Sequence, residues 1–137
     1  MISDDSTRPA PRSLEEELQA AASEDFKERA DAARALAGHL DVPVAFNQLV
    51  TMLDDADIAV IEVAVEVLAI GGGIAGLTEV LRALGANDDN AGYHIRDKLA
   101  SLWLDGIPIL DRCQEILSQG HSGAVREGVS EMIEILT

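Results

Sequence analysis

A helix pattern that returns every 30 to 35 residues limits the fold of this 137-residue chain more than any other feature. In the segment from Val60 to Leu68, apolar residues fill the first, fifth, eighth and ninth places, which share one face of an α-helix. The segments that begin at Ile95 and Val125 repeat this pattern in full, and the one that begins at Phe26 is a weaker copy. The offsets of 34, 35 and 30 residues between the four starts are typical of two-helix repeats.

Breaks between the apolar segments divide the chain into eight predicted helices, at about 14–22, 24–39, 43–53, 57–70, 74–85, 90–104, 108–119 and 122–136. Ser13 and Glu16 form the S-x-x-E pattern of a capping box, so the first helix is expected to begin there. Pro43 and Pro108 suit first turns of helices. Glycines stand where helix ends need a positive φ, at Gly71 to Gly73, Gly85, Gly106 and Gly120. No strand is required, and we predict an all-α chain.

Each helix pair exposes an apolar stripe that it cannot bury alone, so the four predicted pairs must stack into one core. Ala64 is expected at a close helix contact in that core, because it occupies the fifth place of the most apolar helix. The first helices of the pairs each close on a leucine, namely Leu18, Leu53, Leu84 and Leu117. Residues 1–12 contain two prolines and no apolar period, which predicts a disordered lead-in to a single domain at 13–137.

The pattern D-x-x-V-x-x-x-A-x-x-V-L at Asp57 to Leu68, with Ile95-Arg96 and Val125-Arg126 later, is similar to the second-helix consensus of HEAT-like repeat proteins, including the short bacterial ones. The resemblance covers about residues 14–136, and it departs from the family at Ile61, where a basic residue is usual, and in the first repeat. It implies a right-handed α-solenoid of about four antiparallel helix pairs whose second helices line the concave side. It also implies protein binding as the function.

Charge narrows the choice of partner, since 25 acidic and 10 basic side chains give a net charge of −15 and a pI near 4.3. Such a chain repels the phosphates of nucleic acids and anionic membrane surfaces, so we expect neither as a ligand. The most apolar run, Ile58 to Ile70, is broken by Glu62 and Glu66 and is too short to span a bilayer. The single cysteine, Cys113, cannot form an internal disulfide, and no targeting segment is evident, which together indicate the cytoplasm.

The sequence contains no pattern typical of a catalytic or metal site. The histidines His39, His94 and His121 fall in three different repeats without ligand spacing, and Cys113 has a core position with no histidine near it in sequence. The acidic loop at Asp54 to Asp57 lacks the central glycine of a calcium loop, which favours helix capping. We therefore expect no enzyme chemistry, no metal and no cofactor.

One set of residues is a candidate binding site. Places two and six after the segment starts carry carboxylates, at Glu28, Glu62, Glu66, Asp97, Glu127 and Glu131. If the second helices line the concave side, these six residues form a row along it, which we call the acidic ladder. Two interpretations are open: a docking surface for a basic protein, or a solvated polar face on which Lys27, Arg96 and Arg126 neutralise neighbouring acids.

The leading hypothesis is a non-enzymatic scaffold or adaptor that docks a partner protein on the acidic ladder. An immunity or inhibitor protein that neutralises a basic toxin is a first alternative, because small size and strong acidity suit that role. A subunit of a bilin-lyase-like enzyme is a second alternative, which rests on the fold of the HEAT-like family alone.

Overall fold

The computed structural model describes residues 12–87 and 89–137, and this part of the chain is all-α, as predicted. The proposed lead-in lies almost wholly outside the described residues. The helices are α1 (Leu14–Ala20), α2 (Phe26–Ala35), the 3₁₀ helix η2 (Leu36–His39), α3 (Pro43–Met52), α4 (Ile58–Gly71), α5 (Gly73–Ala86), α6 (Asn90–Leu104), α7 (Ile109–Ser118) and α8 (Ala124–Leu136).

Capping hydrogen bonds and prolines determine where several helices begin. The capping box is present, because the Glu16 backbone N–H donates to the Ser13 hydroxyl and the Ser13 backbone N–H donates to the Glu16 carboxylate. Aspartates cap three of the second helices by accepting a hydrogen bond from the backbone N–H two residues later, at Asp25, Asp57 and Asp89. Pro43 lies in the first turn of α3, whereas Pro108 precedes α7 as its cap residue.

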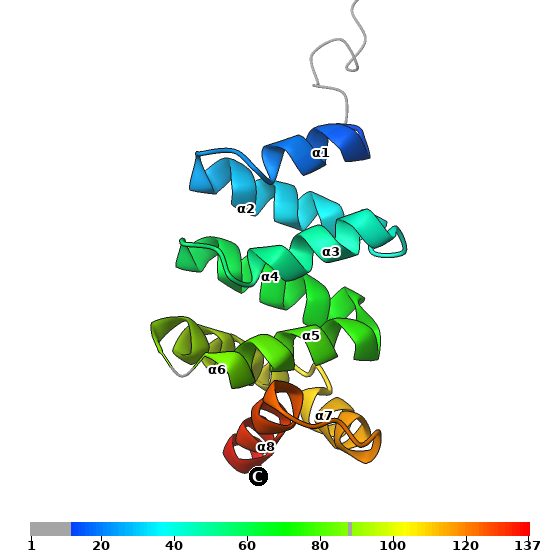
Figure 1. Cartoon of the computed structure of the whole chain (residues 1–137), viewed down its shortest axis with the longest axis vertical. Helices are drawn as coiled ribbons and strands as arrows, with labels where there is room; N and C mark the ends of the chain where they lie inside the picture. The colour runs from blue at the N-terminus through cyan, green and yellow to red at the C-terminus, as the bar shows by residue number, and fades with distance from the viewer. Residues whose placement is uncertain (1–11, 88) are drawn as a thin grey trace, which may run out of the picture.

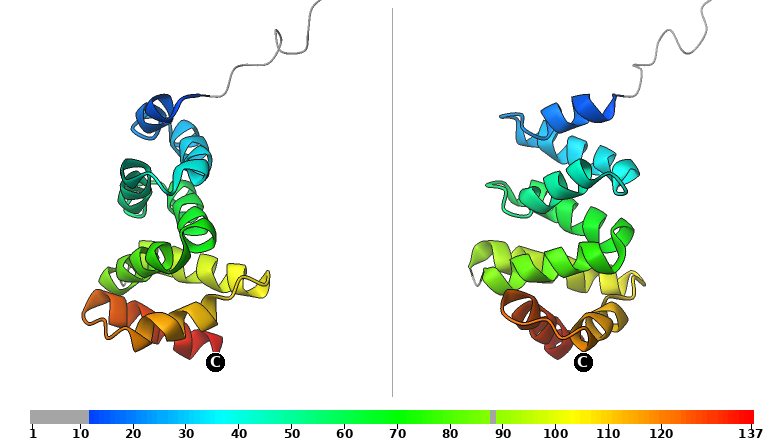
Figure 2. Two further views of the ribbon diagram at one scale, coloured as in Figure 1. Left: turned by 90° about the vertical axis from the view of Figure 1, so that its right-hand side faces the viewer. Right: turned by 45° about the vertical axis from the view of Figure 1, so that its right-hand side comes forward.

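The glycine run at 71–73 is a sharp corner between two helices that almost touch. Gly71 ends α4, and Gly73 begins α5 with a φ of 63°. Figure 2 shows the consequence, because α5 and α6 run across the left view while α1 and α3 point toward the reader. The direction of the helices therefore changes between the first four and the last four.

Successive helices follow the long axis of the molecule from α1 to α8, as Figure 1 shows. Along one side of this stack α2 packs against α4 and α4 packs against α6. The turns α1–α2, α3–α4 and α5–α6 all lie at the left edge of Figure 1, so three consecutive helix pairs turn at the same edge of the molecule. The α7–α8 turn departs from this edge.

Most of the apolar positions that the repeat pattern aligns are buried in the structure. The starts Val60, Ile95 and Val125 are buried and Ala64 is fully buried, but Phe26, the first residue of α2, is 39% exposed. The leucines Leu53 and Leu84 are buried and Leu18 is half-buried. Leu117, however, is exposed, so the recurring leucine does not mark a core position in the last pair. The buried stripe of α7 consists of Ile109, Cys113 and Ile116, at i, i+4 and i+7, and leaves Leu117 beside it.

The closest approach between helices is the crossing of α5 and α8, where two glycines replace side chains. An ideal Cβ at Gly85 would lie 1.8 Å from the carbonyl oxygen of Ala124, and one at Gly128 would lie 2.0 Å from that of Leu81. Gly85 is therefore not the positive-φ helix end that the sequence predicts, since it lies inside α5. The last helix pair packs mainly across α5, and α8 meets α6 only briefly.

Candidate functional site

The six carboxylates of the acidic ladder all lie on second helices. Glu28 is on α2, Glu62 and Glu66 are on α4, Asp97 is on α6, and Glu127 and Glu131 are on α8. None of them is buried. Asp97 and Glu127 are exposed and the other four are half-buried, so every member is accessible to solvent.

The two α4 members each face a basic side chain on α6. The Glu62 carboxylate lies 3.9 Å from Nδ1 of His94, and the Glu66 carboxylate lies 3.7 Å from Nζ of Lys98. Both distances exceed the range of a hydrogen bond, so these are loose ion pairs across solvent-accessible surface. Pairs of this kind contribute between 0 and about 1 kcal/mol to stability. The carboxylates are thus partly neutralised and still available to another cation.

Two further members have partners. Arg96 on α6 donates a hydrogen bond to the Glu131 carboxylate on α8, and its guanidinium also lies 5.7 Å from the centre of the Tyr93 ring. Glu28 accepts a hydrogen bond from the Ser23 hydroxyl and lies 3.9 Å from Arg12. Four of the six carboxylates therefore have a basic side chain as a neighbour. In residues 12–87 and 89–137 we find no ion pair for Asp97 or Glu127.

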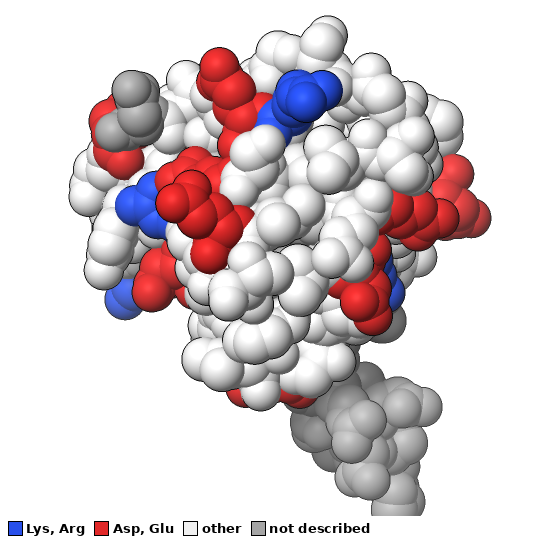
Figure 3. Space-filling view, turned by 90° about the horizontal axis from the view of Figure 1, so that it is seen from below, with Lys and Arg blue, Asp and Glu red and all other residues white. Residues whose placement is uncertain are grey.

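The acidic ladder is consequently not where most of the negative charge resides. On the face seen in Figure 3, acidic side chains form separate groups at opposite sides of the molecule, several with a basic side chain beside them and uncharged surface between them. An equal number of described acids lies in the turns that join first to second helices, at Glu24, Asp25, Asp54, Asp55, Asp57 and Asp89. Three of these aspartates cap helices, so part of the net charge has a structural use.

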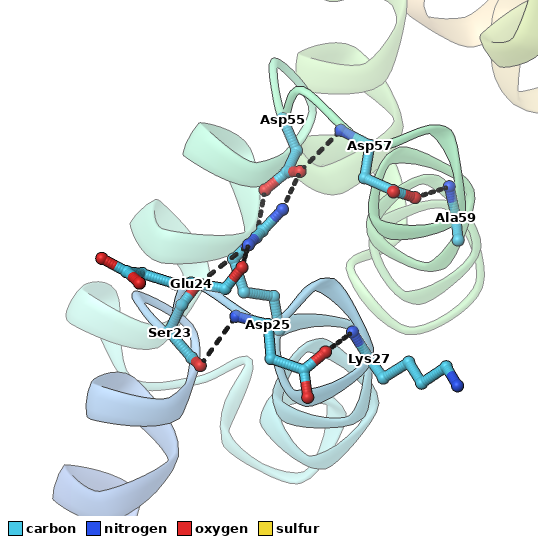
Figure 4. Close-up of polar contacts among 8 residues, drawn as sticks. Ser23, Glu24, Asp25, Lys27, Asp55, Asp57 and Ala59 are labelled. Atoms are coloured by element: carbon cyan, nitrogen blue, oxygen red, sulfur yellow. Dashed lines mark hydrogen bonds and ion pairs between the residues drawn. The ribbon is translucent and has the colours of Figure 1, made fainter.

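Arg29 ties two of these acidic turns together. Its Nε and Nη2 donate to the two carboxylate oxygens of Asp55, each at 3.0 Å, and its Nη1 donates to the backbone carbonyls of Ser23 and Glu24 at 2.9 and 3.1 Å. Asp55 also accepts from the backbone N–H of Asp57 at 2.8 Å. These hydrogen bonds are the dashed lines in Figure 4. The hydrogen bond to Asp55 is the main cause of a raised Arg29 pKa. This Arg29 clip joins the first repeat to the second.

The remaining titratable candidates take structural positions. His39 ends the 3₁₀ helix, His121 lies in the α7–α8 turn within 3.2 Å of the Gln119 side-chain oxygen, and His94 stacks edge-on against Tyr93. Cys113 is fully buried, and this burial raises the pKa of its thiol from 9.0 to about 12. A neutral, inaccessible thiol is a poor nucleophile. Within the described ranges, no three His, Cys, Asp or Glu side chains gather in a way that could hold a metal ion.

A groove between α3 and α5 is a surface feature that sequence reasoning missed. Hollows of about 550 Å³ and about 340 Å³ lie at its two ends. We call it the α3–α5 groove; its lining includes Phe46, Val50, Ala75, Ala83 and Arg82. A signal was present in the sequence, because Pro43–Met52 contains no charged residue although 26% of the chain is charged.

Comparisons with protein-family models, curated proteins and solved structures found no match to the chain. In the part of the chain that the structure describes, no helix combines the length and the apolar character that crossing a bilayer requires.

Proposed function

We propose that the chain is a HEAT-like repeat protein, a right-handed α-solenoid, that acts as a non-enzymatic protein-binding module in the cytoplasm. The fold part of this proposal is supported by the packing of α2 on α4 and of α4 on α6, and by the burial of three of the four repeat starts, Val60, Ile95 and Val125. Stacked helix pairs present long side surfaces, and such surfaces suit the recognition of another protein. The reduced, buried Cys113 is consistent with a reducing compartment.

One observation carries the functional proposal: the α4 carboxylates are partly exposed and only loosely paired. The side chains of Glu62 and Glu66 are 39% and 43% exposed, and their basic partners on α6 lie beyond hydrogen-bond distance. A lysine or arginine of a partner can therefore approach either carboxylate without first breaking a hydrogen bond. Asp97 on the neighbouring helix adds a third exposed carboxylate. A partner with a basic surface fits this face best.

The test compares three forms of the protein in affinity capture from the native host with quantitative mass spectrometry. The forms are wild type, Glu62→Lys with Glu66→Lys, and a control with Asp111→Lys and Glu115→Lys. The control makes the same charge change at the same i, i+4 spacing, on two exposed residues of α7. We expect a protein with a basic surface that wild type and control retain and the α4 variant loses.

The captured protein is then titrated at about 0.05 M and about 0.3 M salt, where a docking surface built from charges must lose affinity as the Debye length shrinks. Equal retention by all three forms would remove the acidic ladder as a docking surface. A captured toxin that the chain inhibits would establish the immunity alternative, and colour on co-expression with a bilin would establish the lyase alternative.

A further inference from the structure

The two hollows of the α3–α5 groove follow one another along the same two helices. Phe46 borders the first hollow and Val50 the second, and these residues lie one helical turn apart on α3. On α5, Ala75 borders the first hollow and Ala83 the second, two turns apart on one face. Both helices run in the same direction along the groove. A ten-residue helix such as α3 is about 15 Å long, so the groove is long enough for roughly three turns of another helix.

The walls of the groove are apolar and largely uncovered. In the described ranges, α3 is the one α-helix without an aspartate, glutamate, lysine or arginine. Phe46 and Val50 are only half-buried, and Val44 on the same helix is 52% exposed. The α5 wall consists mainly of small side chains, with Ala75 exposed and Ala83 half-buried. Two helices with a shallow apolar channel between them form the kind of surface on which an amphipathic helix lays its apolar face.

The charges at the two ends of the groove define its occupant further. Asp41 borders the first hollow and Asp54 borders the second, and both are exposed. The lining of the second hollow also contains one opposite pair, Glu79 and Arg82, which hydrogen-bond to each other. An occupant thus meets a net negative charge in each of the two hollows. Lysine or arginine at both ends of an apolar helix is the complementary arrangement.

Other occupants fit this pattern less well. A second copy of the chain carries the same net charge of −15, so association is opposed by repulsion. Its apolar helix α3 also has Asp41 and Asp54 at its own ends, which repeats the charge of the groove. Residues 1–11 contain two prolines, and their only large apolar side chains are Met1 and Ile2, so they lack an apolar stripe.

We propose that the α3–α5 groove binds an amphipathic helix of a partner protein, about three turns long, with an apolar stripe and a basic residue near each end. The inference rests on the proposed protein-binding function and assigns it a second surface, separate from the acidic ladder. A partner that uses both surfaces would gain affinity through two linked contacts.

The probe is a displayed library of 14-residue peptides on a helix-forming alanine and glutamine frame, with all other positions randomised, selected against the full chain. Peptides that bind are expected to share apolar residues at i, i+3, i+4 and i+7 and lysine or arginine at both ends. In ¹⁵N NMR spectra of the labelled protein, the best peptide is expected to shift the amides of Phe46, Val50, Ala75 and Ala83. No selected peptide, or shifts confined to other helices, would overturn the proposal.

Matched variants identify the site. Ala75→Trp fills the groove and is expected to weaken the best peptide by at least about tenfold, whereas Ala59→Trp, an equally exposed position on α4, leaves its affinity unchanged. Asp41→Asn with Asp54→Asn is expected to weaken binding several-fold and to reduce its salt dependence. The Glu62→Lys, Glu66→Lys variant binds the peptide normally, which separates this surface from the acidic ladder. Equal weakening by both tryptophans, or a dimer in sedimentation that Ala75→Trp dissolves, would refute a partner helix.

Discussion

The crossing of α5 and α8 can be tested by one substitution, because the crossing determines whether that substitution raises or lowers the stability of the protein. Replacing glycine by alanine inside a helix normally stabilises a protein by about 0.5–1 kcal/mol, because alanine restricts the unfolded chain. Gly128 lies inside α8, so propensity alone predicts that Gly128→Ala raises stability. The structure predicts the opposite. The new Cβ would lie 2.0 Å from the Leu81 carbonyl oxygen and 2.9 Å from its carbon, and both are backbone atoms that cannot rotate away.

The size of the effect follows from how far the helices must separate. Relieving a 2.0 Å contact to the normal range of more than 3 Å requires α8 to move by about 1 Å relative to α5. Such a movement loosens the fully buried side chains of Leu81, Val129 and Met132 along the seam. Overpacking in cores costs about 1–3 kcal/mol. After the propensity gain is subtracted, we expect a net loss of about 1 kcal/mol, which lowers Tm by roughly 3–5 °C in a domain of this size.

The assay is thermal and urea unfolding followed by circular dichroism, with Gly38→Ala as the matched control. Gly38 lies in the 3₁₀ helix with no heavy atom within 4 Å of its ideal Cβ, and Gly38→Ala should be neutral or slightly stabilising. Gly85→Ala makes the reciprocal clash, so it should destabilise as well. The double variant should lose less stability than the sum of the two single losses, because one separation of the helices relieves both clashes. Gly128→Ala as stable as Gly38→Ala would show that α8 does not cross α5 at this distance.

Three further predictions test the core and the Arg29 clip. Arg29→Met should lower Tm clearly more than Arg34→Met, because Arg29 joins two turns through four hydrogen bonds whereas Arg34 makes one exposed pair within its helix; equal losses would contradict the clip. Ala64→Asp should place an unpaired carboxylate at a fully buried position and unfold the domain or lower its stability by several kcal/mol, which circular dichroism measures. Cys113 should not react with a thiol reagent at about pH 8 until denaturant is added. The pKa of the Cys113 thiol is 9.0 when exposed and about 12 in the folded protein, so its contribution to stability is complete below pH 9.0 and falls between pH 9.0 and about 12. Cys113→Ala should remove this part of the loss of stability at alkaline pH.

The helices themselves could be predicted from the sequence because their signals are local. Caps such as Ser13 and Asp57 act within three residues of where they stand, and apolar spacing within one helix identifies the buried face. Gly85 was misassigned for the same reason. Glycine at the end of an apolar segment usually marks a helix end. The role of Gly85 in packing depends on its close contact with Ala124 of α8, which lies 39 residues later in the sequence.

The candidate site was less predictable, because charge neutralisation occurs between repeats. The sequence places Glu62 and Glu66 one turn apart on one face, and this part is local. Their basic partners, His94 and Lys98, are each 32 positions away, and which residues face each other depends on how α6 packs against α4. A shift of one residue in that packing would bring Asp97 toward α4, where its carboxylate would repel those of α4. In the folded protein, basic side chains therefore lie beside four of the six carboxylates of the acidic ladder.

The corner between α4 and α5 is the structural cause of both candidate surfaces. Gly76 has no side chain, and an ideal Cβ there would lie 2.2 Å from the Leu68 carbonyl oxygen, so α5 crosses α4 at backbone contact distance. Because α5 is held against α4, it touches α3 only slightly, and the facing sides of α3 and α5 stay open as the groove. The same corner returns the chain so that α6 packs on α4, which brings His94 and Lys98 to Glu62 and Glu66. The groove lies among first helices and the acidic ladder among second helices, so a partner bound at one surface leaves the other accessible.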